Sequence, residues 1–379
     1  MSEVGRVTYL ITASGVGGAE VQVRELAMAM KSRGWQTNAI SMLPLGEVFA
    51  DLPDAGIPTA TLGMRRSVPD PRVMRQLRSL LQRHDTQILH AHMVHACLLA
   101  RLVRLVYPKP KVISTMHSQN QGSRWRNVAY RLTDRLGACS TTVSSVARED
   151  ALRGHMAPPS RLKVVPNGID TARYAPDPEV RRQTRESLGI SDEFLWLATG
   201  RLVEAKDYPN MIAAMARVVQ DQDVPVRLVI AGHDMGGLEA SLRAQLAVDG
   251  ITPNVDFLGL RRDVSDLMQA ADGFVMSSAW EGLPMVLLEA GASGLPAVVT
   301  EVGGSRDAVL DGRTCYVVAK ADPDALADAM TRLMRLPDVD RRAMGDAARA
   351  HTVQTYDMES TADRWDAIYR QLLGVGTSR

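Results

Sequence analysis

Two glutamates in the stretch WEGLPMVLLEA, residues 280–290, have a spacing that permits three kinds of chemistry. Glu281 precedes a Gly-Leu-Pro turn, and Glu289 lies on the second turn of the helix that follows. A glycosidase acid/base pair needs carboxyls roughly 5–9 Å apart, which this spacing allows. A metal site needs further His or Asp partners nearby, and neither D-x-D nor H-x-x-x-H occurs here. Carboxylates only accept hydrogen bonds and suit vicinal hydroxyls, so we interpret the pair as a clamp for hydroxyl groups.

Two cations follow the predicted strand FLWLATG, residues 194–200. Arg201 and Lys206 stand in ATGRLVEAKD, at the carboxyl end of that strand, where cations neutralise the charge of a departing diphosphate. Taken alone, this motif is more simply interpreted as a charged surface loop. A diphosphate site is favoured only when the other motifs are considered with it.

A glycine-rich turn, ASGVGGAE, connects the first predicted strand to a helix from about Ala19 to Arg33. It is not G-x-G-x-x-G, and no acidic residue ends a second strand about 20 positions later, which disfavours a nicotinamide site. Gly17 and Gly18 instead permit a ligand to approach a helix N-terminus, whose unpaired N–H groups suit phosphate oxygens.

Histidines end two predicted strands of the first half, in LHAHMVHA and TMHS. His117 stands alone at a strand end, where it can point at a ligand, although such a histidine is more often structural. Of His90 and His92, we expect one to point into the packing of the sheet.

Short apolar runs alternate with helical patterns along the whole chain, which indicates βαβ units on parallel sheets. The rhythm restarts after the turn-rich segment 166–178, so we predict two doubly wound α/β domains, residues 1–168 and 169–354, that face each other across a ligand cleft. An amphipathic helix at about 355–373, within an apolar pattern that spans 353–373, either packs back on the first domain or completes the second.

Composition limits the class of protein. The 379 residues include three cysteines without metal-ligand spacing, which favours a reducing compartment, and we expect neither a signal peptide nor a spanning helix. Residues 1–165 contain 22 Lys and Arg against 11 Asp and Glu, whereas the remainder contains 22 against 32. A basic half suggests an anionic partner or simply a solvated surface, and the lack of interleaved aromatic residues disfavours nucleic acid.

An ordered set of motifs that runs nearly end to end resembles the retaining glycosyltransferases of family 4, which have the GT-B fold and include bacterial enzymes of polysaccharide and glycolipid assembly. The motifs are GVGGAE (15–20), LHAH (89–92), TMH (115–117), VPNGID (165–170), GRLVEAKD (200–207), FLG (257–259), DV (263–264), EGLPMVLLEA (281–290) and SGLPAVVT (293–300).

The resemblance implies a role for each matching residue. Glu281 and the backbone N–H groups of Leu283, Met285 and Val286 hold hydroxyls of the donor sugar. Glu289 holds the nucleotide ribose, and His117 contacts the sugar near C6. The implied catalytic set is His117, Arg201, Lys206 and Glu281. The implied donor-binding set is Gly17, Gly18, Arg201, Lys206, Arg262, Val264, Glu281, Gly282, Leu283, Pro284, Met285, Val286 and Glu289, and the acceptor side is Gly17, His92, His117 and Ser118.

Two departures from the family pattern affect these assignments. AGHDMGG at 231–237 replaces a common Gly-x-Gly, and Ser118 replaces a common glycine.

The implied reaction is transfer with retained anomeric configuration, without a metal or other cofactor, from a nucleotide sugar for which family frequency favours UDP. We expect a lipid-linked or anionic glycan acceptor in surface polysaccharide assembly and a cytoplasmic protein that docks peripherally on the inner face of the membrane through its basic half. The alternatives are a sugar-nucleotide epimerase on the same fold and a non-catalytic module that binds nucleotide sugars.

Overall fold

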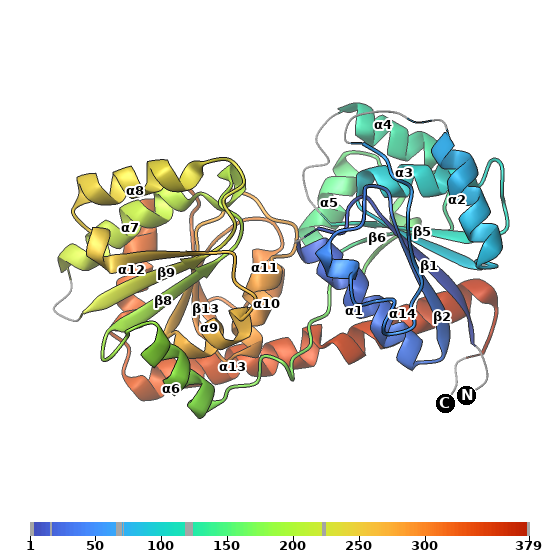
Figure 1. Cartoon of the computed structure of the whole chain (residues 1–379). Helices are drawn as coiled ribbons and strands as arrows, with labels where there is room; N and C mark the ends of the chain where they lie inside the picture. The colour runs from blue at the N-terminus through green and yellow to red at the C-terminus, as the bar shows by residue number, and fades with distance from the viewer. Residues whose placement is uncertain are drawn as a thin grey trace. The chain divides into compact units, whose positions relative to one another are not determined.

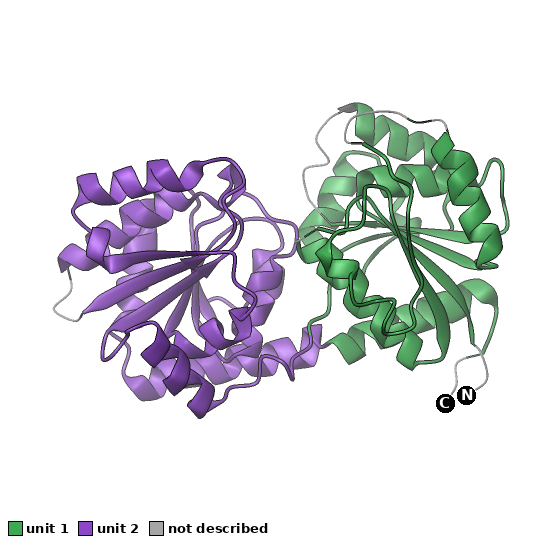
Figure 2. Cartoon of the chain, in the orientation of Figure 1, with its two compact units in different colours: residues 1–169, 358–379 green, residues 170–357 purple. Residues whose placement is uncertain are grey.

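The computed structural model describes residues 4–15, 17–65, 70, 72–117, 124–221 and 225–376. The chain divides into two compact units (Figure 2). Unit 1 consists of residues 1–169 and 358–379, and unit 2 consists of residues 170–357.

Unit 1 is built on a parallel sheet in which the strand order is β3-β2-β1-β4-β5-β6-β7 (Figure 1). The order reverses between β1 and β4, which is the switch point of a doubly wound sheet. The strands are β1 (Gly5–Ile11), β2 (Trp35–Ser41), β3 (Thr59–Thr61), β4 (Ile88–His92), β5 (Lys111–Met116), β6 (Cys139–Thr142) and β7 (Leu162–Val164).

Successive residues of a strand point to opposite sides of the sheet, so the apolar strands of unit 1 place apolar side chains on both faces. Helices cover both faces. Tyr9 belongs to the core that α1 and α14 cover, whereas Leu10 belongs to the core under the other helices. The helices of unit 1 are α1 (Gly18–Ser32), α2 (Arg72–Arg83), α3 (Val94–Val103), α4 (Arg124–Thr133), α5 (Ser145–Arg153) and α14 (Met358–Leu373), with short 3-10 turns η1 (Glu47–Phe49), η2 (Asp134–Leu136) and η3 (Pro159–Arg161).

Unit 2 repeats the plan with a parallel sheet of order β10-β9-β8-β11-β12-β13. Its central strand β8 is buried over its whole length, as expected for a parallel strand covered on both faces. The strands are β8 (Phe194–Thr199), β9 (Val226–Ala231), β10 (Val255–Gly259), β11 (Gly273–Met276), β12 (Ala297–Thr300) and β13 (Cys315–Val318).

The core on one face of this sheet is closed by α7, α8 and α12, while α10 packs against α13 and α6 against α9. The helices of unit 2 are α6 (Pro178–Ser187), α7 (Tyr208–Asp221), α8 (Leu238–Asp249), α9 (Val264–Ala270), α10 (Met285–Ala292), α11 (Ser305–Ala308), α12 (Pro323–Met334) and α13 (Asp338–Tyr356), with 3-10 turns η4 (Glu204–Lys206) and η5 (Thr252–Asn254).

The apolar pattern at 353–373 is not one helix. The structure ends α13 at Tyr356 and begins α14 at Met358, and Asp357 between them has ψ 141°, outside the helical region. The Thr171 hydroxyl donates to the Asp357 carboxylate at 2.6 Å, and the Met358 N–H donates to the Ile169 carbonyl at 2.8 Å. These bonds hold the helix break where the chain passes from unit 2 to unit 1.

Candidate active site

Three of the predicted site residues come together at the carboxyl edge of the unit 2 sheet. Lys206 ends the 3-10 turn η4 after β8, Glu281 lies in the loop after β11, and Glu289 lies on α10. The strands of this sheet are parallel, so the loops that follow them open at the same edge.

Lys206 and Glu281 form a largely buried ion pair. Nζ of Lys206 donates to Oε1 of Glu281 at 2.6 Å, and the Ser278 hydroxyl donates to the same oxygen at 2.9 Å. The two charged side chains are only 18% and 15% exposed. No residue that the structure describes donates to Oε2 of Glu281, so this oxygen retains its capacity to accept hydrogen bonds from ligand hydroxyls.

Glu289 lies on α10 among groups that act on its pKa in opposite directions. Burial raises the pKa of Glu289, while a hydrogen bond from Tyr174 and the charges of Arg173 and Lys206 act in the opposite direction. Lys206 therefore influences both carboxylates. Sequence reasoning did not identify Tyr174, which lies in the segment interpreted as a domain boundary; a lone aromatic residue among turn-forming residues was the available signal.

Arg201 differs from Lys206 because it forms no ion pair with any described residue. Its side chain is exposed, and Nη1 lies 3.9 Å from the Met235 sulfur. Its guanidinium therefore remains available to an anion, which it can bind through two parallel N–H donors.

The turns after β8 and β9 approach each other so closely that only glycine fits. A Cβ on Gly232 would fall on the carbonyl oxygen of Gly200, far inside van der Waals contact. Gly200 also has φ +144°, a backbone conformation that favours glycine. The Tyr208 hydroxyl donates to the same Gly200 carbonyl at 2.8 Å. Both turns are thus held in close register at the edge that carries Lys206.

The segment 231–237, which departs from the family pattern, contains a carboxylate that caps the N-terminus of α8. The Asp234 carboxylate accepts hydrogen bonds from the N–H groups of residues 236–239, at the start of α8. Partial desolvation acts to raise the pKa of Asp234, but the four backbone hydrogen bonds together outweigh it and lower the pKa. The N-terminus of α8 is therefore occupied by a side chain of the protein.

The N-terminus of α10 has no such side-chain cap. Pro284 takes the N-cap position without a side-chain hydrogen bond, and Leu283 anchors the preceding loop with only 6% exposure. The other predicted residues of this segment are Gly282, Met285 and Val286, the last two forming the start of the helix. Because α10 follows β11, its positive end lies at the carboxyl edge of the sheet.

The predicted base-binding residues lie at the same edge. Arg262 is exposed in the turn between β10 and α9, and Val264 is the first residue of α9. Asp263, between them, is paired with Arg261 through a bond of 2.7 Å from Nε.

In unit 1, the glycine-rich turn leads from β1 into α1. Gly17 is the N-cap residue, and Gly18 begins the helix. The Glu20 side chain lies where a Cβ on Gly17 would stand. The turn thus opens at the carboxyl edge of the unit 1 sheet, next to a helix N-terminus.

His92 and His117 are directly bonded to each other at this edge. Nδ1 of His92 lies 2.9 Å from Nε2 of His117. Burial lowers the pKa of His117 to about 4, and burial with neighbouring imidazoles lowers the pKa of His92 well below its ordinary value. Both rings are therefore neutral at pH 7. Ser118, assigned to the acceptor side, lies outside the described residues.

Both His90 and His92 point into the same packed face, rather than one of them. They are two residues apart on β4, and side chains at that spacing share a face. Their ring centroids are 4.1 Å apart, and the residues are 0% and 1% exposed. His90 bonds through Nδ1 to the Tyr369 hydroxyl at 2.6 Å and through Nε2 to Thr115 Oγ1 at 2.7 Å. Helix α14 thereby reaches the residues beside His117.

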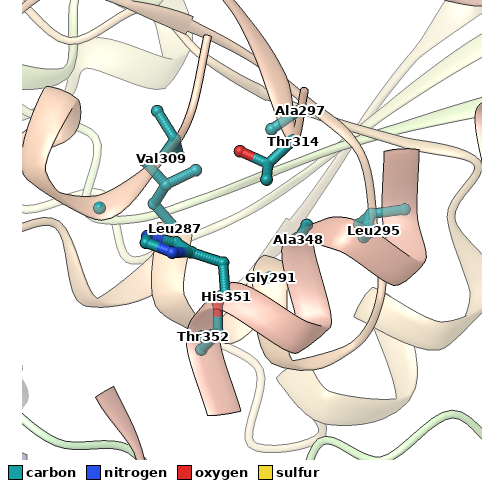
Figure 3. Close-up of a pocket in the computed structure, with 10 residues that line it drawn as sticks. Leu287, Gly291, Leu295, Ala297, Val309, Thr314, Ala348, His351 and Thr352 are labelled. Atoms are coloured by element: carbon teal, nitrogen blue, oxygen red, sulfur yellow. The ribbon is translucent and has the colours of Figure 1, made fainter. Parts of the chain in front are cut away.

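Two hollows in the described part of the chain lie away from these residues. Between α10 and α13, a space of about 10 Å³ is lined by apolar side chains together with Thr314, His351 and Thr352 (Figure 3). This volume is at the lower limit for one water. A hollow of about 480 Å³ in unit 1 lies beside the start of β2, at Trp35–Asn38, which is the opposite edge from His117.

Two features are absent from the described part of the chain. No group of three or more His, Cys, Asp or Glu side chains lies close enough to hold a metal ion. No helix is both long and apolar enough to cross a bilayer.

Family models match both halves of the chain. Residues 16–173 match a model described as Glycosyltransferase Family 4, and residues 180–351 match one described as Glycosyl transferases group 1.

Among curated relatives, the chain is 30% identical over 313 residues to the GDP-mannose-dependent alpha-(1-6)-phosphatidylinositol monomannoside mannosyltransferase of Mycolicibacterium smegmatis, covering 78% of this chain and 80% of that protein. It is 24% identical over 311 residues to the UDP-Gal:alpha-D-GlcNAc-diphosphoundecaprenol alpha-1,3-galactosyltransferase of Escherichia coli, covering 80% of each. A similar solved structure is Anabaena Alr3699/HepE in complex with UDP, at a TM-score of 0.85 and 20% identity over 97% of this chain and 100% of that one.

Proposed function

Because this chain belongs to glycosyltransferase family 4 and is a GT-B enzyme that transfers a sugar from a nucleotide sugar to an acceptor, we propose that it does so with retained configuration, from a UDP-sugar, without a metal, to a lipid-linked anionic acceptor. The observation that carries this proposal is the cluster in unit 2 that follows β8 and β11. It contains the Lys206–Glu281 pair, Glu289, and Arg201, which pairs with no described residue.

Different residues of that cluster bind different parts of the donor. Arg201 and Lys206 bind the diphosphate, and the N-terminus of α10 adds its positive end. Glu281 accepts from hydroxyls of the sugar through Oε2, and Glu289 accepts from the ribose hydroxyls. These positive groups neutralise the leaving diphosphate, so this mechanism needs no metal ion.

The reaction proceeds on one face of the sugar. None of the assigned side chains serves as a covalent nucleophile, so the acceptor hydroxyl attacks from the side that the diphosphate leaves. His117 is assigned to the donor sugar near C6.

A UDP-sugar is the first choice because the Anabaena structure contains UDP and the name of the E. coli relative specifies UDP-Gal. The name of the Mycolicibacterium relative specifies GDP-mannose, which makes a GDP-sugar the second candidate. A thermal-shift panel of UDP-glucose, UDP-galactose, UDP-N-acetylglucosamine and GDP-mannose, with and without EDTA, separates them. Stabilisation by one UDP-sugar that EDTA leaves unchanged supports the proposal, and a response that EDTA abolishes contradicts the metal-free mechanism.

The acceptor is assigned to a lipid because both relatives have lipid-linked acceptors in their names, a diphosphoundecaprenol and a phosphatidylinositol monomannoside. In this chain, α4 carries an exposed apolar stripe that suits contact with lipid. Trp125, Val128 and Leu132 share one face at helical spacing and are 82%, 45% and 76% exposed. Arg131 and Arg135 are also exposed on α4 and η2. An apolar stripe beside cations suits an anionic bilayer surface.

Vesicle flotation tests this docking surface. We expect recovery with vesicles that contain phosphatidylglycerol, and little recovery with phosphatidylcholine alone. The double substitution Trp125→Ser with Leu132→Ser is expected to abolish recovery, whereas Val248→Ser, at a residue of unit 2 that is 86% exposed, serves as the matched control. Equal recovery with neutral and anionic vesicles would contradict the proposal.

A further inference from the structure

Strands β8 and β9 are neighbours in the sheet of unit 2 (Figure 1), and their parallel pairing continues into the turns that follow them. The Leu202 N–H donates to the His233 carbonyl at 3.0 Å, and Leu202 forms a parallel bridge with Asp234. This bridge has the same register as the ladder between the two strands. Arg201 and His233, one position earlier in each turn, are therefore paired neighbours.

Arg201 and His233 project from the same side of this pairing. Paired residues of neighbouring strands point to the same face, and consecutive residues point to opposite faces. Both side chains are exposed, whereas Leu202 is 2% exposed, which is the alternation expected of extended segments. Met235, two positions after His233, is exposed as well, and its sulfur lies 3.9 Å from Nη1 of Arg201. The Arg201 side chain is therefore directed toward the turn that carries His233.

Close packing of the two turns holds these side chains in a fixed relation. Gly232 lies so close to the Gly200 carbonyl that no side chain fits between them. Lys206 passes over the same place, since a Cβ on Gly200 would stand 3.5 Å from Nζ of Lys206. The two cations assigned to the diphosphate thus lie next to Gly200, and His233 is the paired neighbour of one of them.

The ring of His233 is available to a ligand. It makes no hydrogen bond or ion pair with any residue that the structure describes. Asp234, the carboxylate beside it in the chain, is bonded instead to the N–H groups of residues 236–239 at the start of α8. Even a neutral imidazole has one N–H donor, and a phosphate oxygen is an acceptor for it.

We propose that His233 is a further ligand of the donor's diphosphate, with an N–H that donates to a phosphate oxygen beside the guanidinium of Arg201. This inference rests on the proposed function, which assigns Arg201 and Lys206 to the diphosphate. It gives a role to the segment 231–237, where the chain departs from the family pattern. The N-terminus of α8 is capped there by the chain's own carboxylate, and the exposed histidine supplies a donor to the anion in its place.

Calorimetry on the full chain tests this contact with three anions, UDP, GDP and inorganic pyrophosphate. His233→Ala is expected to weaken binding of pyrophosphate and of the tighter-binding nucleotide about tenfold, the effect of one hydrogen bond to a charged group. Binding of the matching nucleoside, uridine or guanosine, is followed by ligand-observed NMR and is expected to be unchanged, because a nucleoside has no phosphate. An equal loss of nucleoside binding would overturn the direct contact and indicate a general disturbance of the site.

Two conservative variants separate the hydrogen bond from the bulk of the ring. The amide of His233→Gln reaches about as far as Nε2, and the amide of His233→Asn about as far as Nδ1, so one of the two is expected to restore most of the affinity. The control is His155→Asn, at an exposed histidine of unit 1. His155 has φ +51°, a conformation that asparagine adopts readily, so this variant is expected to bind every ligand as the wild type does.

The anions distinguish failure of this inference from failure of the proposed function. Unchanged binding of pyrophosphate and nucleotide in His233→Ala, or a loss that neither amide restores, overturns the role of His233. Binding of pyrophosphate that depends on His233, without binding of UDP or GDP, supports the contact and contradicts the proposed function. A wild-type protein that binds none of the three anions overturns both.

Discussion

Replacing Lys206 with methionine removes the cation of the ion pair with Glu281 and keeps a side chain of similar length. At 2.6 Å between Nζ and Oε1, the gross Coulomb attraction is about 6 kcal/mol at an effective dielectric constant of 20. Desolvation of two charges that are only 18% and 15% exposed offsets most of it. We therefore expect a net coupling of about 2 kcal/mol between the two side chains.

The coupling is measured by a double-mutant cycle of Lys206→Met and Glu281→Gln. Lys206→Met removes the cation that faces the Glu281 carboxylate and leaves Ser278 as its hydrogen-bond donor, so we expect a loss of about 3 kcal/mol. Glu281→Gln is expected to cost about 1–2 kcal/mol. The double variant is expected to lose about 2 kcal/mol less than the sum, since no unpaired charge remains.

Thermal unfolding without ligand is the assay, followed at the transition that nucleotide shifts to higher temperature. For a unit of this size, 2 kcal/mol corresponds to about 4–8 °C in Tm. The exposed pair Arg217–Asp324 in the same unit, with side chains 52% and 58% exposed, provides the control, and its cycle is expected to show coupling below about 0.5 kcal/mol. Effects that add within about 1 °C in the Lys206–Glu281 cycle would refute the argument that burial makes this pair interdependent.

Three further predictions test the site and its supports. Glu281→Ala is expected to abolish sugar transfer while binding of free nucleotide largely survives in calorimetry, whereas Glu289→Ala is expected to weaken nucleotide binding itself; equal loss of nucleotide binding in both variants would show that the clamp is mis-assigned. Gly232→Ala is expected to lower stability by about 2 kcal/mol, because its Cβ overlaps the Gly200 carbonyl oxygen, and an unchanged melting temperature would mean that the two turns separate without cost. Burial lowers the pKa of His117 to about 4, below its value of about 6.5 in an unfolded chain. The unfolded chain therefore binds the proton more readily, so the contribution of His117 to the free energy of unfolding is complete above about pH 6.5 and is lost as the pH falls toward 4. Melting curves between pH 7.5 and 5 are expected to show a smaller decline in Tm in His117→Gln than in the wild type. Equal declines in Tm would contradict the assignment.

Much of the parallel-sheet architecture was predictable because the signals were local. The buried strand β8 and the helix α10 stand out as an apolar run and as a helix after proline. Elements with weaker patterns, such as α6, which has no buried residue, and the three-residue strand β3, were not predicted. Their conformation depends on neighbours that the sequence pattern does not reveal.

The candidate site was predictable in its residue types and not in its pairings. The strand-end positions of Lys206, Glu281 and His117 follow from the order of strands and turns. The ion pair of Lys206 with Glu281, the bond of Tyr174 to Glu289 and the bond of His92 to His117 join residues that are distant in the chain. The periodicity of apolar residues cannot predict such contacts, because it indicates only on which face of a helix or strand a side chain lies.

The C-terminal helix α14 separates what the sequence determines from what the tertiary structure determines. Its amphipathic pattern by itself determined that residues after Met358 form a helix with an apolar face that includes Trp365 and Tyr369. Only the tertiary structure decided that this face belongs to unit 1, where Tyr369 meets His90. An apolar face must be buried, but the sequence offers two sheets that can bury it. The choice between them was made by long-range packing, hydrogen bonding and the helix break at Asp357, which no local pattern encodes.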